Sequence, residues 1–186
     1  MASFLTCSAL FTLIFIFLIT PFFIVTDAKF SEQLPAPKAS HIVEKMSHLH
    51  FYFHDIFSGK HPTAITVAGR ENKFGGTVIT DDPLTEGVEH RSKVVGRAQG
   101  MYAWSSLDAA SLLVVMNFEF IEGKYNGSSF SLLGRNPFLE TVREMPVVGG
   151  TGLFRFARGY ALAKTFRFSG GKGDAVVEYN VFVMHH

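Results

Sequence analysis

The stretch His48-Leu49-His50-Phe51-Tyr52-Phe53-His54-Asp55-Ile56 alternates strictly between two sets of side chains. Successive side chains of an extended strand point to opposite faces. Leu49, Phe51, Phe53 and Asp55 therefore share one face, and the histidines share the other face with Tyr52. A period of two with apolar residues on one side predicts a β-strand whose apolar face is buried.

The same period recurs along most of the chain, and short segments rich in Gly, Pro, Asn and Asp separate the runs. We expect strands at residues 48–56, 63–68, 76–80, 93–103, 112–122, 128–133, 153–168 and 175–184. About eight strands without crossover helices predict an all-β fold, most economically an eight-stranded antiparallel β-barrel, because closure removes the sheet edges. A barrel of that size can hold one small ligand.

The composition excludes several classes of protein. Of the 186 residues 47% are hydrophobic, 20 are Phe and only 18% are charged, which excludes a disordered chain. The formal charge of +1 provides no basic field for nucleic acid. The single cysteine, Cys7, excludes an internal disulfide framework and any multi-cysteine metal site.

The first residues read as a targeting segment. Residues 10–25 are almost entirely apolar and lead to Thr26-Asp27-Ala28, which offers small residues at a cleavage site. We expect a signal peptide over 1–28, an extended arm over 29–45, and a barrel domain over 46–186, in a protein secreted to the extracellular space and free of the membrane after cleavage. The segment lacks a basic start, so a membrane anchor remains an alternative.

One sequon accompanies this segment. Asn126-Gly127-Ser128 fits an N-glycosylation site on an exposed turn of a secreted chain, so we expect a glycan on Asn126. The same residues fit a tight Asn-Gly hairpin turn, and both interpretations can hold together.

Asp55 is the first candidate for chemistry. A carboxyl group on an apolar interior face is costly unless it is paired or functional, and burial would raise its pKa. The alternative is that Asp55 closes the strand by accepting hydrogen bonds from the turn amides near Ser58 and Gly59. The sequence leaves both interpretations open.

Two other groups of residues have side chains that can bind a metal or a ligand. His48, His50 and His54 share a face, but no acidic ligand lies on that face of the segment, so we expect no metal site and keep a metal-dependent barrel enzyme only as an alternative. We also expect Phe154, Arg158 and Tyr160 to share one face of a later strand, where an arginine among aromatic rings can stack or pair with a carboxylate. The glycine run before that strand reads as a turn.

Six blocks then follow in a characteristic order: Phe51–Ile56, Asp81–Thr85, Val95–Tyr102, Val147–Gly152, Phe154–Ala161 and Gly173–Asn180. In this order the chain resembles plant dirigent proteins over about residues 46–186. The resemblance implies a secreted, homotrimeric barrel of the dirigent and allene oxide cyclase type. It implies a role in plant phenolic metabolism and defence, in which phenoxy radicals supplied by an auxiliary laccase or peroxidase couple on one face, with no cofactor and no oxidase activity of the barrel itself.

The resemblance also implies site residues. The family's pocket acid is similar to Asp55, its pocket arginine to Arg143 and its pocket tyrosine to Tyr102, with Asp82 as a further catalytic candidate. We expect the substrate to bind among aromatic and basic side chains: Phe51, Phe53, Phe154, Arg158 and Tyr160.

One position departs from the lignan-forming dirigents, which carry an Asp seven residues before the pocket arginine; here it is Asn136. An amide cannot act as a carboxyl acid or base. Together with the Arg143-Glu144-Met145-Pro146 segment, this departure resembles the subgroup that includes pterocarpan synthases, which dehydrate an isoflavanol through a quinone methide and close a ring. Three functions therefore remain: a dirigent that directs radical coupling or quinone-methide cyclisation, a dehydratase of the pterocarpan synthase type, and a non-catalytic, lipocalin-like carrier.

Overall fold

Antiparallel strands account for nearly all the regular structure of this protein. The computed structural model describes residues 31, 43–170 and 173–186. The strands are β1 (Lys45–Asp55), β2 (Ala64–Ala68), β3 (Thr77–Thr85), β4 (Val94–Trp104), β5 (Leu112–Phe120), β6 (Ser129–Asn136), β7 (Arg143–Thr151), β8 (Arg158–Phe168) and β9 (Ala175–His185). Two short 3-10 turns follow β5 and β7, η2 (Gly123–Tyr125) and η3 (Gly152–Phe154).

The predicted signal peptide (1–28) and nearly all of the predicted arm (29–45) lie outside these described residues. Within the described part of the chain, no helix has the length and apolar character needed to cross a bilayer.

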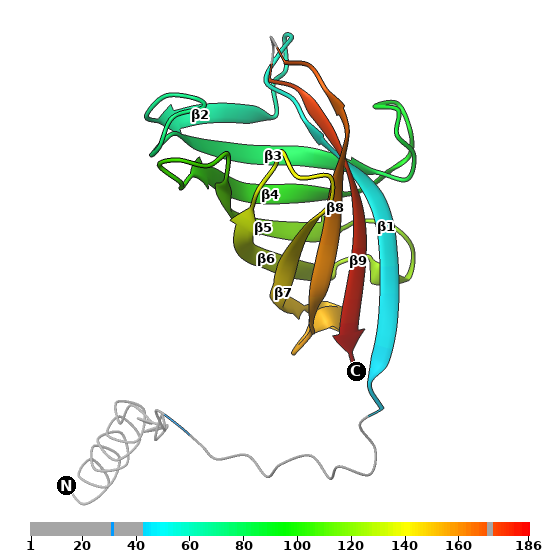
Figure 1. Ribbon diagram of the computed structural model, residues 1–186. Helices are drawn as coiled ribbons and strands as arrows, with labels where there is room; N and C mark the ends of the chain where they lie inside the picture. Colours follow the sequence, from blue (N-terminus) through cyan, green and yellow to red (C-terminus); the bar gives the residue numbers. More distant parts are fainter. Residues whose placement is uncertain (1–30, 32–42, 171–172) are drawn as a thin grey trace, which may run out of the picture. The chain divides into compact units, whose positions relative to one another are not determined.

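The strands close into a barrel. Their order is β1-β9-β8-β7-β6-β5-β4-β3-β2, and β1 also pairs with β3 through Tyr52–Thr85 and Phe53–Leu84 (Figure 1). This pairing joins the two sides of the sheet, so that every strand except β2 belongs to a closed antiparallel barrel. β2 lies along the part of the β3 edge that β1 does not use. The predicted all-β, eight-stranded antiparallel barrel is therefore confirmed.

The eight barrel strands are not the eight runs that we expected. We expected no strand between residues 133 and 153 and interpreted the glycine run 149–152 as a turn. The structure places β7 there, with Arg143, Met145 and Val147 buried in a period of two. Pro146 and the glycines that follow conceal this strand in the sequence. The expected strand 63–68 corresponds to β2, which is outside the closed ring.

β3 continues through Asp81-Asp82-Pro83, which we expected to end it at Thr80. Proline has no amide proton to donate, so within a sheet it is tolerated where one side of the strand has no partner. Pro83 pairs with Arg97 of β4, while neither β1 nor β2 pairs with it on the other side. The longer β3 places Asp82 inside the fold, where a loop would have left it outside.

Aromatic rings fill the barrel at the end nearest η3. Phe118 stacks on Phe130 with ring centroids 5.1 Å apart and lies 5.4 Å from Tyr179. The cluster formed by these contacts, the aromatic core, comprises Phe51, Phe118, Phe120, Phe130, Phe154 and Tyr179. Such pairs contribute about 0.5–1.5 kcal/mol each beyond the burial of their area. The opposite end of the interior, where β1 ends and β9 begins, is left for a cavity.

Close strand packing leaves no room for a side chain at Gly100 of β4. A Cβ atom on Gly100 would lie 2.2 Å from the carbonyl oxygen of Val115 on β5, whose backbone cannot move aside. We expect Gly100→Ala to destabilise the protein by about 1–3 kcal/mol, the usual cost of overpacking. Urea denaturation followed by circular dichroism measures this change.

Gly149→Ala on β7 is the matched control, because nothing lies within 4 Å of its added Cβ. We expect its denaturation midpoint to equal or slightly exceed that of the unmodified protein, since alanine restricts the unfolded chain more than glycine does. Equal midpoints for the two variants would contradict the close approach of β4 and β5.

Candidate active site

A cavity of about 620 Å³ opens at the end of the barrel opposite the aromatic core. Residues of seven strands form its walls, and the loops after β1, β2, β6 and β8 form its rim. The wall residues are Phe53, Asp55, Tyr102, Trp104, Leu112, Val114, Met116, Asn136, Arg143, Lys164, Thr165, Phe168, Ala175, Val177 and Tyr179. Phe57, Glu71, Asn72, Phe138, Leu139, Glu140, Thr141, Gly170 and Gly173 complete the lining from the loops. This volume lies in the range of sites that enclose a small organic molecule.

Asp55 is the last residue of β1 and faces this cavity. Its side chain is on the same face as Phe51 and Phe53, as the alternation predicted, and the residue is 8% exposed. The Tyr102 hydroxyl donates a hydrogen bond to Asp55 Oδ2 at 2.7 Å, whereas Oδ1 has no partner among the described residues. Burial, only partly offset by that hydrogen bond, raises the pKa of Asp55 to about 7. The group can therefore hold a proton near neutral pH.

The alternative interpretation of Asp55, that it caps the following turn, is not what the structure shows. The amides of Phe57 and Ser58 donate to Asp174 Oδ1 at 2.8 and 2.9 Å, and the Ser58 hydroxyl donates to Asp174 Oδ2 at 2.5 Å. Asp174, from the loop before β9, takes the capping role. Asp55 is thereby free to face the cavity.

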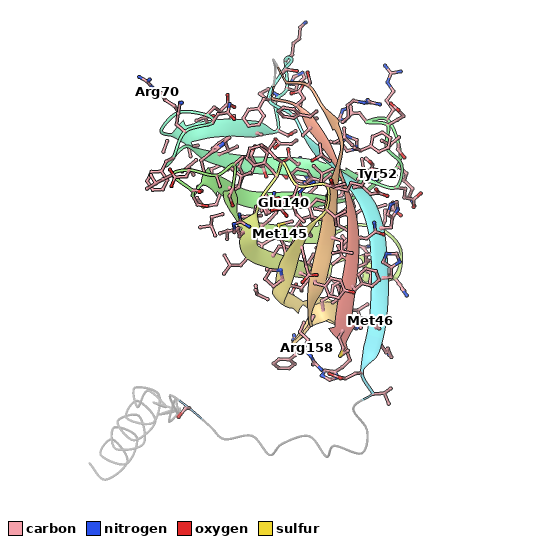
Figure 2. All side chains as sticks on the ribbon, in the orientation of Figure 1. Met46, Tyr52, Arg70, Glu140, Met145 and Arg158 are labelled. Atoms are coloured by element: carbon pink, nitrogen blue, oxygen red, sulfur yellow. The ribbon has the colours of Figure 1, made fainter. Side chains whose placement is uncertain are left out.

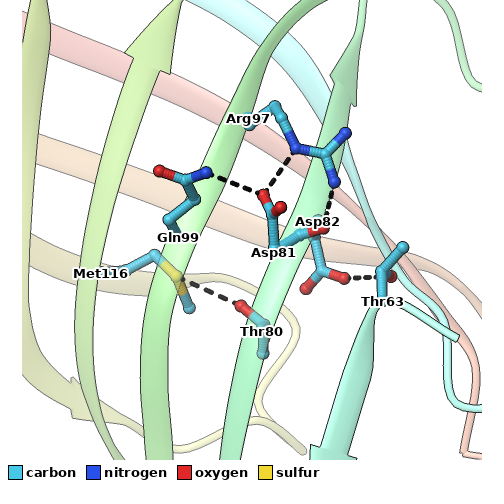
Figure 3. A network of polar contacts seen from close by, with 7 residues as sticks. All are labelled: Thr63, Thr80, Asp81, Asp82, Arg97, Gln99 and Met116. Carbon is cyan, nitrogen blue, oxygen red and sulfur yellow. Dashed lines mark hydrogen bonds and ion pairs between the residues drawn. The ribbon is translucent and has the colours of Figure 1, made fainter.

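Asp82 lies on β3 behind the cavity wall and is fully buried. The Thr63 hydroxyl donates to its Oδ1, while Oδ2 has no partner among the residues described (Figure 3). Burial, together with the nearby charge of Asp55, raises the pKa of Asp82 to about 8. Of the four catalytic candidates, Asp55, Tyr102 and Arg143 line the cavity. Asp82 does not line it, so a ligand in the cavity would not contact Asp82.

Its neighbour Asp81 faces outward and behaves in the opposite way. Arg97 Nε donates to Asp81 Oδ1 at 2.5 Å, and Gln99 Nε2 donates to the same oxygen at 3.1 Å (Figure 3). These bonds hold the pKa of Asp81 below its usual value. Strand alternation thus separates an ordinary surface carboxylate from a buried acid at adjacent positions.

Two tyrosines line the cavity. Tyr102 of β4, whose hydroxyl is bonded to Asp55, has its pKa raised by burial and by that carboxyl group, so it remains a phenol. Tyr179 of β9 is buried between the aromatic core and the cavity, and burial raises its pKa to about 12. Sequence reasoning missed Tyr179, although the alternation of Ala175, Val177 and Tyr179 along β9 would have placed it on the interior face.

Arg143, the first residue of β7, carries a positive charge into the cavity. The residue is 2% exposed, and burial lowers the pKa of its guanidinium. Its Nε donates to the amide oxygen of Asn136 at 3.2 Å, while Nη1 has no partner among the described residues. Because Asn136 is neutral, no carboxylate of the described part of the chain balances this charge by direct contact. A ligand with a negative oxygen would satisfy both the charge and the free N–H donors.

Only one of the five residues expected to bind substrate lines the cavity. Phe53 lines the cavity, as do the catalytic candidates Asp55, Tyr102 and Arg143. Phe51 and Phe154 are buried in the aromatic core, away from the lining.

The prediction that Arg158 and Tyr160 bind substrate inside the barrel is wrong. Arg158 is on the outer surface beside Met46, where Arg158 Nη1 lies 2.6 Å from Glu44 Oε1 (Figure 2). Tyr160 also faces outward and stacks on Phe182. The cause lies upstream: η3 and the positive φ of Phe156 end one extended segment, and β8 begins anew at Arg158 with Ala161 and Ala163 inward.

The three histidines of β1 do not form a metal site. His48 Nε2 lies 2.9 Å from Asn180 Oδ1, and His50 Nε2 lies 2.8 Å from Glu178 Oε1, both on the outer surface. His54 is buried against Thr85 Oγ1 at 2.7 Å, and burial lowers its pKa to about 4. No group of three or more His, Cys, Asp or Glu side chains gathers around one point in the described residues.

Comparison with known proteins places this geometry in a family. A model of the family described as dirigent-like protein matches residues 46–184. The chain is 50% identical to dirigent protein 21 of Arabidopsis thaliana over 168 residues, which cover 87% of this chain and 89% of the relative. It is 46% identical to pterocarpan synthase 1 of Glycyrrhiza echinata over 184 residues, or 94% and 98% of the two chains.

Solved structures agree. The pterocarpan synthase dirigent protein GePTS1 superposes with a TM-score of 0.75 at 49% identity, covering 78% of this chain and 87% of that one. A pyocyanin demethylase shares the fold alone, with a TM-score of 0.51 at 13% identity. From the family match over the whole barrel and from relatives about half identical over most of their length, the chain belongs to the dirigent family.

Proposed function

We propose that this protein binds a phenolic intermediate in the barrel cavity and catalyses the loss of water and ring closure of an isoflavanol, as a dehydratase of the pterocarpan synthase type. The observation that carries the proposal is the arrangement of Asp55, a buried acid bonded to Tyr102, in one cavity with the unbalanced charge of Arg143. The similarity to pterocarpan synthases over most of the chain supports the same reaction class.

The chemistry follows from the charges of the two groups. Arg143 binds the substrate's phenol as a phenolate, and protonated Asp55 gives its proton to the hydroxyl group on the carbon attached to that ring. The carbon–oxygen bond breaks, water leaves, and the phenolate electrons flow inward to form a neutral quinone methide. A second phenol oxygen of the same molecule then attacks the methide carbon and passes its proton to Asp55. The ring closes, the phenolate at Arg143 re-forms, and the acid is restored.

The other dirigent reaction would use the same cavity differently. Two phenoxy radicals supplied by an auxiliary laccase or peroxidase would couple while the walls hold them in one relative orientation, and this orientation needs no acid. Asn136 favours the dehydratase, because the amide leaves Asp55 as the one buried carboxyl in the described lining. A lipocalin-like carrier would need neither Asp55 nor Arg143.

Asp55→Asn tests the acid. We expect turnover of an isoflavanol to fall at least about 100-fold, the usual contribution of a general acid, with little change in affinity. Chiral chromatography measures the product. Quenching of Trp104, the single tryptophan, measures binding from inside the cavity.

Asp81→Asn makes the same change at an outward position and serves as the control. Unchanged turnover in Asp55→Asn would exclude the dehydratase. A protein that binds phenolic ligands but turns over neither an isoflavanol nor laccase-generated radicals would be a carrier.

Arg143→Met tests the phenolate site. Hydrogen bonds to a charged group contribute about 1.5–3 kcal/mol, so we expect the affinity for an isoflavanol to fall about 10- to 100-fold. The affinity for the methyl ether of the same phenol, which cannot ionise, should change much less. Trp104 quenching with both ligands gives the comparison. An equal loss for both would assign Arg143 a purely structural role.

The outer surface suggests how the barrel assembles. The side chains of Ile65, Ile79, Met101, Val115 and Leu133 lie opposite one another in register across β2 to β6, and all but Met101 are between 41% and 54% exposed. An unbroken apolar row on the surface is typical of a contact between chains. We propose that this row joins copies of the chain into the homotrimer that the family resemblance implies, in the extracellular space.

The mass of the assembled protein tests this proposal. Protein secreted from plant cells should scatter light as a trimer, and mass spectrometry of the same sample should show cleavage after Ala28 and a glycan on Asn126, which lies on an exposed turn. We expect Val115→Lys to give monomers, because a charge in the row opposes contact. Glu119→Lys, outward on the same strand but beyond the row, is the control. A trimeric Val115→Lys variant would move the interface elsewhere.

A further inference from the structure

Two buried acids come together where β1 leaves β3. The pairs Tyr52–Thr85 and Phe53–Leu84 define an antiparallel register, and continuing that register by two residues sets Asp55 opposite Asp82. Both side chains are on the interior side of their strands and both residues are buried. The charge of Asp55 acts on Asp82, so the two carboxyl groups are close enough to interact. Two negative charges that interact in a low-dielectric interior would repel each other strongly.

Within the described part of the chain, each carboxyl group of the pair has one oxygen with a hydrogen-bond donor and one without. Asp55 Oδ2 accepts from Tyr102 and Asp82 Oδ1 accepts from Thr63. The remaining oxygens, Asp55 Oδ1 and Asp82 Oδ2, are buried and have no donor among the described residues. A buried carboxylate oxygen without a donor costs free energy. One proton placed between the two groups would supply both oxygens with a partner and remove one of the two charges.

The surrounding charges favour keeping that proton. Glu71, in the loop after β2, and Asp174, in the loop before β9, both act on Asp55 as negative charges. The hydroxyls of Thr63 and Thr80 and the positive charge of Arg97 act in the opposite direction on Asp82, but burial and the charge of Asp55 outweigh them. Arg143 acts on Tyr179. The pKa values of Asp55 and Asp82 are both raised, to about 7 and about 8, with burial as the main cause.

We infer that Asp55 and Asp82 form a carboxyl dyad that shares one proton, and that Asp82 is a positioning residue that keeps Asp55 protonated without touching the substrate. The inference deepens the proposed function, which needs Asp55 as an acid, but the dyad itself exists in the protein without any substrate. Like the paired acids of other enzymes, the two groups titrate as a unit, in two macroscopic steps.

Carbon-13 NMR of the full chain, labelled at the aspartate carboxyl carbons, tests the dyad directly. The chain contains six aspartates, and the Asp55→Asn and Asp82→Asn variants assign the two signals. In the unmodified protein we expect one proton on the pair to persist well above pH 5. In Asp82→Asn the Asp55 signal should titrate about one pH unit or more lower, because the neighbouring carboxyl is gone and an amide can donate to Oδ1.

The matched control is Asp81→Asn, one residue away on the outer face, which should leave both titrations unchanged. Thr63→Val provides a second variant: it removes the donor to Asp82 and should raise the upper titration step further. Ionisation of both carboxyls below pH 5 in the unmodified protein, or an unshifted Asp55 in Asp82→Asn, would overturn the dyad.

Stability gives an independent readout. A group whose folded pKa is raised stabilises the fold at acid pH and loses that contribution as pH rises through the folded pKa. The melting temperature should therefore fall between pH 4 and pH 8, and Asp82→Asn should flatten this fall while Asp81→Asn should not. Because neither measurement uses substrate, a paired titration without isoflavanol turnover would refute only the proposed function. Turnover with independent titrations would refute only the dyad.

Discussion

Closure of the barrel depends on a very short pairing between β1 and β3. Only Tyr52–Thr85 and Phe53–Leu84 are paired there, after which β1 diverges and β2 takes over the β3 edge at Ala64. The amides of Thr63 and Ala64 donate to the carbonyl of Ile56 at 2.8 and 3.1 Å, so the two ends of the loop over residues 57–62 are held together. This junction places the end of β1, and with it Asp55, at the wall of the cavity.

The interior is divided into a packed end and an open end with different physical properties. The aromatic core excludes water and fixes the barrel at the η3 end, where Phe118 and Phe130 are fully buried. At the open end the walls carry the acid Asp55 and the cation Arg143 among aromatic and aliphatic side chains. The low dielectric raises the pKa of Asp55, so the acid keeps its proton. It also strengthens the attraction between the Arg143 guanidinium and an anion that binds beside it. A phenol that can lose its proton matches this environment.

The sequence predicted those parts of the site that lie on regular strands. The alternation of β1 correctly placed Phe53 and Asp55 on the interior face. The family resemblance predicted that Tyr102 and Arg143 belong to the same site, and both line the cavity. Prediction from the sequence failed at irregular points. The strand β7 was hidden by Pro146, and the interior face of β8 was assigned one residue out of step because η3 and the positive φ of Phe156 interrupt the extended chain. A shift of one residue reverses every face that follows it, as it did for Arg158 and Tyr160.

By itself the sequence determined the all-β class and the family, because these depend on local periodicity and on the order of motifs along the chain. The expected number of eight strands agrees with the barrel only because the missed β7 is offset by β2, which lies outside the ring. Only the tertiary structure decided that β2 is outside the ring, that Asp174 caps the turn after β1, and that Asp82 lies behind Asp55. The reason is that contacts between distant strands depend on register, and the register between β1 and β3 is set by the closure of the whole barrel. The pairing of two acids at that junction has no local signature.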